Sequence, residues 1–213
     1  LSKLQPEILY AEGRIRNIMG DPKAALDLFD LVLMAYPNSP YASNALLDAG
    51  IPLLVEKPLA DSVDDAHKLV AKAEKKKTTL AVGHIERFNP AVQALKKHVH
   101  DIGAVVHASA HRFGIPTPRD VDSSFIDQAV HDIDVIAFLT NNTPTHVQAV
   151  QKRFLDAKYD DSCTAIYEFD SFTATVEANR VTPIKTRELI VTGLKGSARL
   201  DYITQDLTIT KAD

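Results

Sequence analysis

The stretch that decides the fold is LLVEKP, residues 53–58 of the 213-residue chain. Its first three residues are apolar, as in a strand buried on both faces, and Pro58 ends the strand because proline cannot donate a ladder hydrogen bond. Glu56 and Lys57 therefore stand at the carboxyl end of a predicted strand. Ligands bind at this edge of open α/β sheets. The stretch thus predicts both a sheet and a candidate site.

Two similar short runs lie on either side of this stretch, at residues 31–35 and 79–82, and turn-forming residues bound them. Helices are expected between and after the three runs, at residues 41–48, 62–77 and 90–100. Ser62 is placed to cap the second of these helices, and lysines crowd its last turn, in keeping with the helix dipole. Alternating strands and helices predict parallel strands with right-handed crossovers, which is part of a doubly wound, Rossmann-like α/β sheet.

The pattern changes after Gly103, where β-branched residues fall in partial alternation. Strands are expected at residues 104–112, 146–153, 165–169, 173–179, 188–192 and 198–202, with a helix near 127–139. This half predicts an α+β domain, a mainly antiparallel sheet with helices on one face. We therefore expect two domains, residues 1–102 and residues 103–213.

The first 29 residues are expected to be helical. A competing interpretation takes residues 6–37 as a single tetratricopeptide-like helical hairpin. The residues near that repeat's small, aromatic and closing positions are Gly13, Gly20, Ala25, Phe29 and Pro37. One such repeat cannot bury its apolar face without neighbours, and the sequence shows no second copy.

Composition narrows the possible partners. The formal net charge is -4, with acids and bases mixed along the chain, so no phosphate-binding basic surface is expected and no nucleic-acid partner. The single cysteine excludes an internal disulfide and suits a reducing compartment, so a cytoplasmic location is expected. No run approaches the roughly 20 apolar residues of a spanning helix, and no membrane association is expected.

Two strand ends carry groups suited to ligand contact. Asn38, in the turn with Pro37, could hydrogen-bond a ribose or an amide. The Lys57 ammonium could hold a hydroxyl and stabilise negative charge developing on its oxygen. The alternative is structural: Pro-Asn is a common turn, and Glu-Lys is a common solvated strand end.

The densest titratable cluster lies at Asp127, His131, Asp132 and Asp134. Asp127 and His131 are four apart, so a helix places them on one face, where the pair could take a proton from an alcohol as its carbon gives up hydride. The alternative is a helix start with acids that favour the dipole and a surface histidine. A metal site is a third possibility, but no second histidine lies at ligand spacing, and no metal ligands are assigned.

Residues 83–90 leave a strand and enter a helix, which brings His84 and Arg87 near the same sheet edge. Arg87 could pair with Glu56 or hold an anionic group. Asn89 caps the helix that Pro90 opens. Cys163 lies in a strand-like stretch and is assigned no role.

Together these pieces resemble the nicotinamide-dependent oxidoreductases of the Gfo/Idh/MocA family, from about Asp30 to the end of the chain. The resemblance rests on the order and spacing of residues 31–38, 49–58, 83–90 and the pair Asp127 and His131. It implies a sugar or nucleotide-sugar substrate and NAD or NADP as cofactor. The run of residues 84–92 is most similar to members that act on nucleotide-linked amino sugars.

The resemblance also assigns roles. It implies that Lys57 assists proton transfer and that Asp127 and His131 serve the substrate, with His131 as the base. The residues it assigns to the cofactor are Pro37, Asn38, Glu56, Lys57, Pro58, His84 and Arg87.

The sequence departs from the family pattern in two places. Tyr36 and Tyr41 stand where the family commonly has threonine and histidine, and none of the eight glycines forms the G-x-G-x-x-G loop that lets backbone approach a pyrophosphate. Two hypotheses follow: an oxidoreductase of this family, or a non-catalytic interaction or scaffold protein built on a dehydrogenase remnant. An exposed sheet edge in the second half would favour a homo-oligomer.

Overall fold

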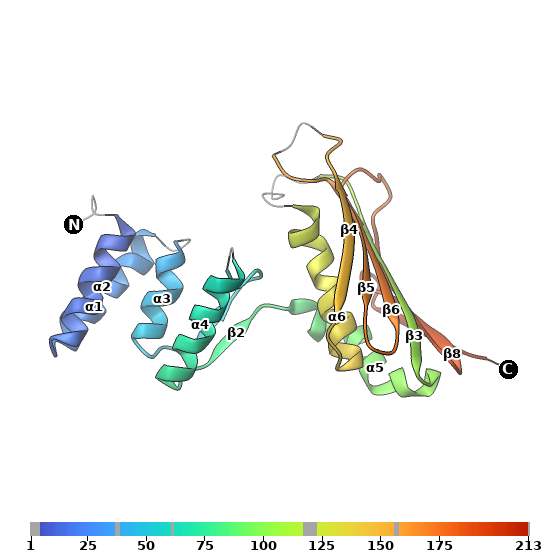
Figure 1. The fold of residues 1–213 in the computed structure, drawn as a ribbon, viewed down its shortest axis with the longest axis horizontal. Coiled ribbons are helices and arrows are strands. Elements are labelled where there is room, and N and C mark those ends of the chain that lie inside the picture. The colour runs from blue at the N-terminus through green and yellow to red at the C-terminus, as the bar shows by residue number, and fades with distance from the viewer. Residues whose placement is uncertain (1–4, 37–38, 61, 117–122, 156–157, 213) are drawn as a thin grey trace. The chain divides into compact units, whose positions relative to one another are not determined.

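The computed structural model describes residues 5–36, 39–60, 62–116, 123–155 and 158–212. These residues form two compact units, Leu1–Gly83 and His84–Asp213 (Figure 1). The division after residue 102 that the sequence suggests stays a prediction. None of the helices in the described ranges has both the length and the apolar character needed to cross a membrane.

The first unit consists of four helices and a two-stranded parallel sheet. Its elements are α1 (Pro6–Ile18), α2 (Pro22–Ala35), α3 (Pro40–Asp48), β1 (Leu53–Val55), α4 (Val63–Lys76) and β2 (Leu80–Val82). In the sheet Leu53 lies opposite Leu80 and Val55 opposite Val82. The parallel pairing of these two strands, joined through a helix, confirms that part of the predicted α/β pattern.

Local signals in the sequence fix where these helices begin and end. The Ser62 hydroxyl accepts a hydrogen bond from the Asp65 amide at 3.1 Å and so caps α4, as expected. The Asp21 carboxylate does the same for α2, accepting from the Ala24 amide at 3.2 Å. After α3, Gly50 adopts a left-handed φ of 73°, which a glycine reaches without strain.

The strand predicted at residues 31–35 is wrong, because these residues form the last part of α2. Their apolar run continues a helical spacing: Ala25, Phe29 and Val32 are buried together against the neighbouring helix. A short apolar run does not by itself distinguish a buried strand from a buried helix. Residues 6–35 therefore form two packed helices, as in the competing hairpin interpretation.

The burial predicted for residues 53–55 is also wrong. Leu54 is 72% exposed and lines a cavity, while Leu53 and Val55 on the same strand are partly buried. Pro37 and Asn38, assigned to the cofactor from the sequence, lie outside the described residues.

A close contact of glycine with an aromatic ring holds the two helices of the hairpin together. Gly13 on α1 is buried, and a Cβ added to it would lie 2.5 Å from Cε1 of Phe29 on α2. The Phe29 ring also packs against Tyr10, with ring centroids 6.0 Å apart. The small residue is needed because any side chain would occupy the space of the ring.

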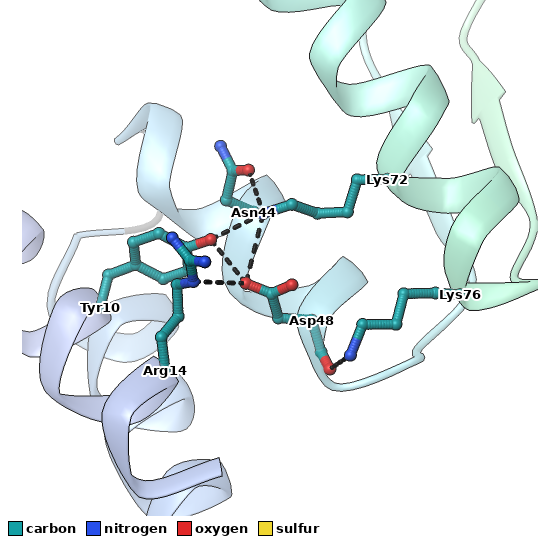
Figure 2. A network of polar contacts seen from close by, with 6 residues as sticks. All are labelled: Tyr10, Arg14, Asn44, Asp48, Lys72 and Lys76. Atoms are coloured by element: carbon teal, nitrogen blue, oxygen red, sulfur yellow. Dashed lines mark hydrogen bonds and ion pairs between the residues drawn. The ribbon is translucent and has the colours of Figure 1, made fainter. Parts of the chain in front are cut away.

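A polar network joins α1 to α3 and α4 (Figure 2). The Tyr10 hydroxyl donates to Oδ2 of Asp48 at 2.6 Å, and Lys72 Nζ donates to Tyr10, Asn44 and Asp48 at 2.6, 2.6 and 3.2 Å. Lys76 adds a bond to the Asp48 carbonyl at 2.8 Å. Burial raises the pKa of Tyr10 and lowers the pKa of Lys72. Each group thus has a partner that offsets its loss of water.

The second unit is built on a seven-stranded sheet in the order β4-β5-β6-β3-β7-β8-β9. Its strands are β3 (Val105–Phe113), β4 (His146–Lys152), β5 (Ser162–Glu168), β6 (Thr173–Asn179), β7 (Thr186–Gly193), β8 (Gly196–Asp201) and β9 (Asp206–Lys211). Only the β3–β6 pair is parallel, which confirms the mainly antiparallel sheet predicted from the sequence.

Helices cover one face of this sheet (Figure 1). They are η1 (Ile85–Phe88), α5 (Pro90–His98), η2 (Val99–Ile102), the π-helical turn η3 (Phe125–Ala129) and α6 (Val130–Thr140). A row of fully buried residues crosses five strands beneath them: Ala165, Val176, Ala110, Leu189 and Leu200. On the other face Ile166 is 47% exposed. This confirms the predicted arrangement of helices on one side.

We predict that Gly13→Ala destabilises the first unit. The added methyl overpacks the Phe29 ring at a cost of about 1–3 kcal/mol, which exceeds the roughly 0.5–1 kcal/mol that alanine gains over glycine within a helix. Urea unfolding of the full chain measures the change. In a Phe29→Leu background the same substitution should become neutral or stabilising, and a Gly13→Ala chain more stable than the parent would contradict the contact.

Candidate functional site

The second unit contains a cavity of about 440 Å³ that Asp127 and His131 both line. Its other polar lining residues are Arg112, Gln128, Lys185 and Arg187. These side chains come from the end of β3, from η3 and α6, and from the start of β7 and the loop before it. The sequence expected Asp127 and His131 on one helix face, and the structure brings them to one cavity.

The helix that carries this pair does not begin as a regular α-helix. Residues Phe125–Ala129 form a π-helical turn before α6, and Ser123 starts it by accepting a hydrogen bond from the Ile126 amide at 3.1 Å. Single π-helical turns are frequent at functional sites. The sequence pattern predicted the helix near residue 127 but not its wider turn.

Asp127 is held by an arginine from β6's carboxyl end. Arg180 Nη2 donates to Oδ2 of Asp127 at 2.9 Å, and the Arg180 side chain is buried. The Arg180 amide donates to the Asp161 carbonyl at 2.8 Å, which fixes its backbone. Sequence reasoning missed Arg180, since nothing in the sequence links a residue 53 positions away to Asp127. The proton transfer expected of Asp127 and His131 stays a prediction.

A buried ion pair lies beside the cavity. Arg112 Nε and Nη2 donate to the two carboxylate oxygens of Asp132 at 2.8 and 3.1 Å, and Nη1 donates to Glu86 at 3.1 Å. Arg112 is 1% exposed and Asp132 is fully buried. Burial alone would lower the pKa of Arg112, but the charge and hydrogen bonds of Asp132 outweigh it and raise that pKa. Arg112 therefore stays charged, and its pairing with Asp132 joins β3 to α6.

Tyr202 closes this ion pair from the other side. Its ring centroid lies 5.0 Å from the Arg112 guanidinium carbon, within cation–π range. Burial, and then the charge of Asp132, raises the pKa of Tyr202 well above its ordinary value. The phenol is therefore neutral and serves as packing for the cation.

A second arginine pairs with the next acid on α6. Arg87 donates through Nε and Nη2 to Asp134 at 2.8 and 2.6 Å, and His84 Nδ1 lies 3.5 Å from the same carboxylate. Within the second unit the acidic partner of Arg87 is thus Asp134, and the pairing with Glu56 stays a prediction. Asp134 was in the titratable cluster seen in the sequence but was given no partner there. The cofactor roles assigned to His84 and Arg87 stay predictions.

In the first unit, Glu56 and Pro58 line a separate cavity of about 650 Å³ beside α3 and α4. Glu56 follows the end of β1, and Gly83, which follows the end of β2, donates its amide to the Val55 carbonyl at 2.7 Å. A Cβ on Gly83 would come within 3.3 Å of Oε2 of Glu56. Lys57 is half-buried, and its bond to Pro58 is cis.

These residues fit only part of a dinucleotide site. A pyrophosphate is held by a strand, a glycine-rich turn and the start of the following helix. The described residues before Leu53 contain helices and no strand, and their sequence lacks the glycine-rich turn. The first unit therefore offers groups at two strand ends, without a pyrophosphate cradle among the residues described.

Neither Cys163 nor a cluster of metal-ligating side chains forms a site among the described residues. Burial raises the pKa of the Cys163 thiol to about 11, so it is protonated and unreactive at neutral pH. Among the described side chains, no group of three or more His, Cys, Asp or Glu residues is placed to hold a metal ion.

The two units combine an α/β part and a mainly antiparallel sheet, and comparison with known proteins establishes the family. The family of oxidoreductases with an NAD-binding Rossmann fold matches residues 11–84, and the Gfo/Idh/MocA C-terminal domain matches residues 92–199. The chain belongs to the Gfo/Idh/MocA family.

Its relatives include a UDP-N-acetylglucosamine 3-dehydrogenase from Acidithiobacillus ferrooxidans, 29% identical over 87% of this chain and 60% of that protein. An inositol 2-dehydrogenase from Rhodococcus erythropolis is 36% identical over 62% of this chain and 40% of that protein. A solved structure of the Acidithiobacillus ferrooxidans enzyme aligns with a TM-score of 0.77 and 26% identity, covering 89% of this chain and 68% of that one. The chain thus spans about 40–60% of these two curated relatives.

We predict that Asp132→Asn destabilises the second unit by about 3–5 kcal/mol, because it leaves the buried Arg112 cation without its carboxylate. The measurement is urea unfolding, followed by circular dichroism. Glu188→Gln is the matched control, since Glu188 pairs with the exposed Arg199 and should cost under about 1 kcal/mol. Equal effects of the two substitutions would show that the buried pair does not hold the unit together.

Proposed function

We propose that this chain carries the substrate-binding and proton-transfer residues of a nicotinamide-dependent oxidoreductase that acts on a hydroxyl of a sugar or nucleotide sugar. The observation that carries the proposal is the cavity that Asp127 and His131 line together. Membership of the Gfo/Idh/MocA family supports the reaction class.

In the proposed reaction the substrate hydroxyl loses its proton to the His131 imidazole as its carbon loses hydride, so the alcohol becomes a ketone. NAD or NADP, when bound, accepts that hydride. Asp127, held by Arg180, is suited to stabilise the imidazolium that forms, since a carboxylate near an imidazole raises its basicity. Lys57 is proposed as a second proton-transfer group on the strength of the family resemblance.

The substrate class is proposed from the relatives. Their names refer to a nucleotide sugar and to inositol, both of which are rich in ring hydroxyls. We also propose a homo-oligomer, because the edge strand β4 is exposed along all seven residues and can pair with a second copy. A cytoplasmic location is part of the same proposal.

A second function is favoured by one specific observation: the described residues before Leu53 form the helical hairpin α1–α2 and α3, with no glycine-rich strand–turn–helix among them. A family member without a pyrophosphate cradle could serve as a non-catalytic interaction protein. Cofactor binding distinguishes the two functions.

We predict saturable binding of NADH or NADPH to the full chain, weakened by Lys57→Ala and unchanged by Lys75→Ala on the exposed end of α4. The chain has no tryptophan, so the emission of the reduced nicotinamide can be followed directly. Absence of binding at millimolar cofactor would favour the non-catalytic function.

We predict that His131→Gln lowers turnover of UDP-N-acetylglucosamine with NAD or NADP by about 100- to 10,000-fold, the range that general-base catalysis supplies. Substrate affinity should change little, because the side chain's size is kept. His146→Gln, on the exposed strand β4, is the matched control. Equal rates for the two variants would remove His131 from the mechanism.

A further inference from the structure

Two arginines lie directly opposite each other on neighbouring strands of the second unit. Arg112 on β3 pairs in register with Arg187 on β7, and both line the cavity that contains His131. Like charges at such a position are destabilising. The charges of Glu86, Asp132 and Asp127 offset this repulsion at Arg187 only in part, because burial and Arg112 still lower its pKa.

The described carboxylates accept hydrogen bonds from Arg112 and not from Arg187. Arg112 is paired with Asp132 and Glu86, and Asp127 accepts from Arg180. No hydrogen bond or ion pair reaches the side chains of Arg187 or Lys185 from any residue that the structure describes. Among the described residues these two cations thus have no hydrogen-bonded counter-charge, although the charges of Glu86, Asp132 and Asp127 act on Arg187.

The surroundings of Arg187 make the lack of a hydrogen-bonded counter-charge costly. Its side chain is half-buried, and burial, followed by the charge of Arg112, lowers its pKa. A guanidinium in such a place gains most from a ligand oxyanion, which can accept two parallel hydrogen bonds from its fork. Lys185 lies two residues before it along the same cavity wall and adds a point charge.

We propose that Arg187 and Lys185 form an oxyanion-binding subsite that recognises the anionic group of the substrate, which is either the phosphate of a nucleotide sugar or the carboxylate of a sugar acid. The subsite rests on the proposed function, since it takes the cavity of His131 as the substrate site. The cavity of about 440 Å³ suits a sugar ring with an anionic substituent.

The test is calorimetric titration of the full chain with UDP, with glucuronate and with neutral N-acetylglucosamine. We expect at least one of the anions to bind more tightly than the neutral sugar, and the one that does identifies the phosphate or the carboxylate as the group recognised. Arg187→Ala should lower the affinity for that anion by about 10- to 100-fold, the usual contribution of a charge-assisted hydrogen bond. The affinity of Arg187→Lys should fall in between, and Lys97→Ala, on the exposed side of α5, should bind as the parent does.

Unfolding by urea distinguishes the subsite from a merely structural role of Arg187. A structural role predicts that Arg187→Ala is less stable than the parent chain, and the subsite predicts that it is not. Removing it relieves the repulsion with Arg112, so Arg187→Ala should unfold at the same or a higher urea concentration than the parent chain. A variant that is less stable and loses the neutral sugar and the anion alike would assign Arg187 to folding and overturn the subsite.

Failure of the subsite and failure of the proposed function can be told apart. If the chain turns over a sugar but Arg187→Ala leaves anion binding unchanged, the subsite is wrong and the proposed oxidoreductase function stands. If Arg187→Ala loses anion binding but the parent chain turns over no sugar, the subsite stands and the proposed oxidoreductase function is wrong. If neither anion binds more tightly than the neutral sugar, or none of the three ligands binds, the subsite is wrong.

Discussion

The buried pair of Arg112 and Asp132 is the interaction on which the second unit depends. An isolated charge in the core would cost several kcal/mol, so each partner is tolerated only while the other is in place. The pair joins the central strand β3 to the first turn of α6. Because His131 precedes Asp132 in that turn, the same contact that fixes the core also fixes the imidazole at the cavity wall.

Three acidic residues on and just before α6 are each paired with an arginine. Asp127, Asp132 and Asp134 accept hydrogen bonds from Arg180, Arg112 and Arg87, three arginines that lie after β6, on β3 and on η1. Three separate parts of the chain are thereby tied to one helix. The sequence grouped these residues as one titratable cluster, and two of its carboxylates, Asp132 and Asp134, hold the fold. Only Asp127 and His131 of that cluster line the cavity.

The difference between what the sequence could and could not predict has a physical cause. Ser62, Asn89 and the lysines of α4 act within one turn of their neighbours, so the helix starts and most strands could be predicted. Residues 31–35 could not, because their burial depends on α1, and a five-residue apolar run satisfies a strand and a helix equally. Arg180 and Arg112 were missed for the same reason: their partners are set by the tertiary fold. His131 and Asp127 were found because their spacing is local.

The two cavities described above lie in different units of the chain. Every described group of the His131 cavity comes from residues 112–187, and the sheet beneath it forms entirely within the second unit. The first unit is held by its own contacts, the Gly13–Phe29 packing and the Tyr10, Asp48 and Lys72 network, none of which involves a ligand. Each cavity is thus built from residues of its own unit.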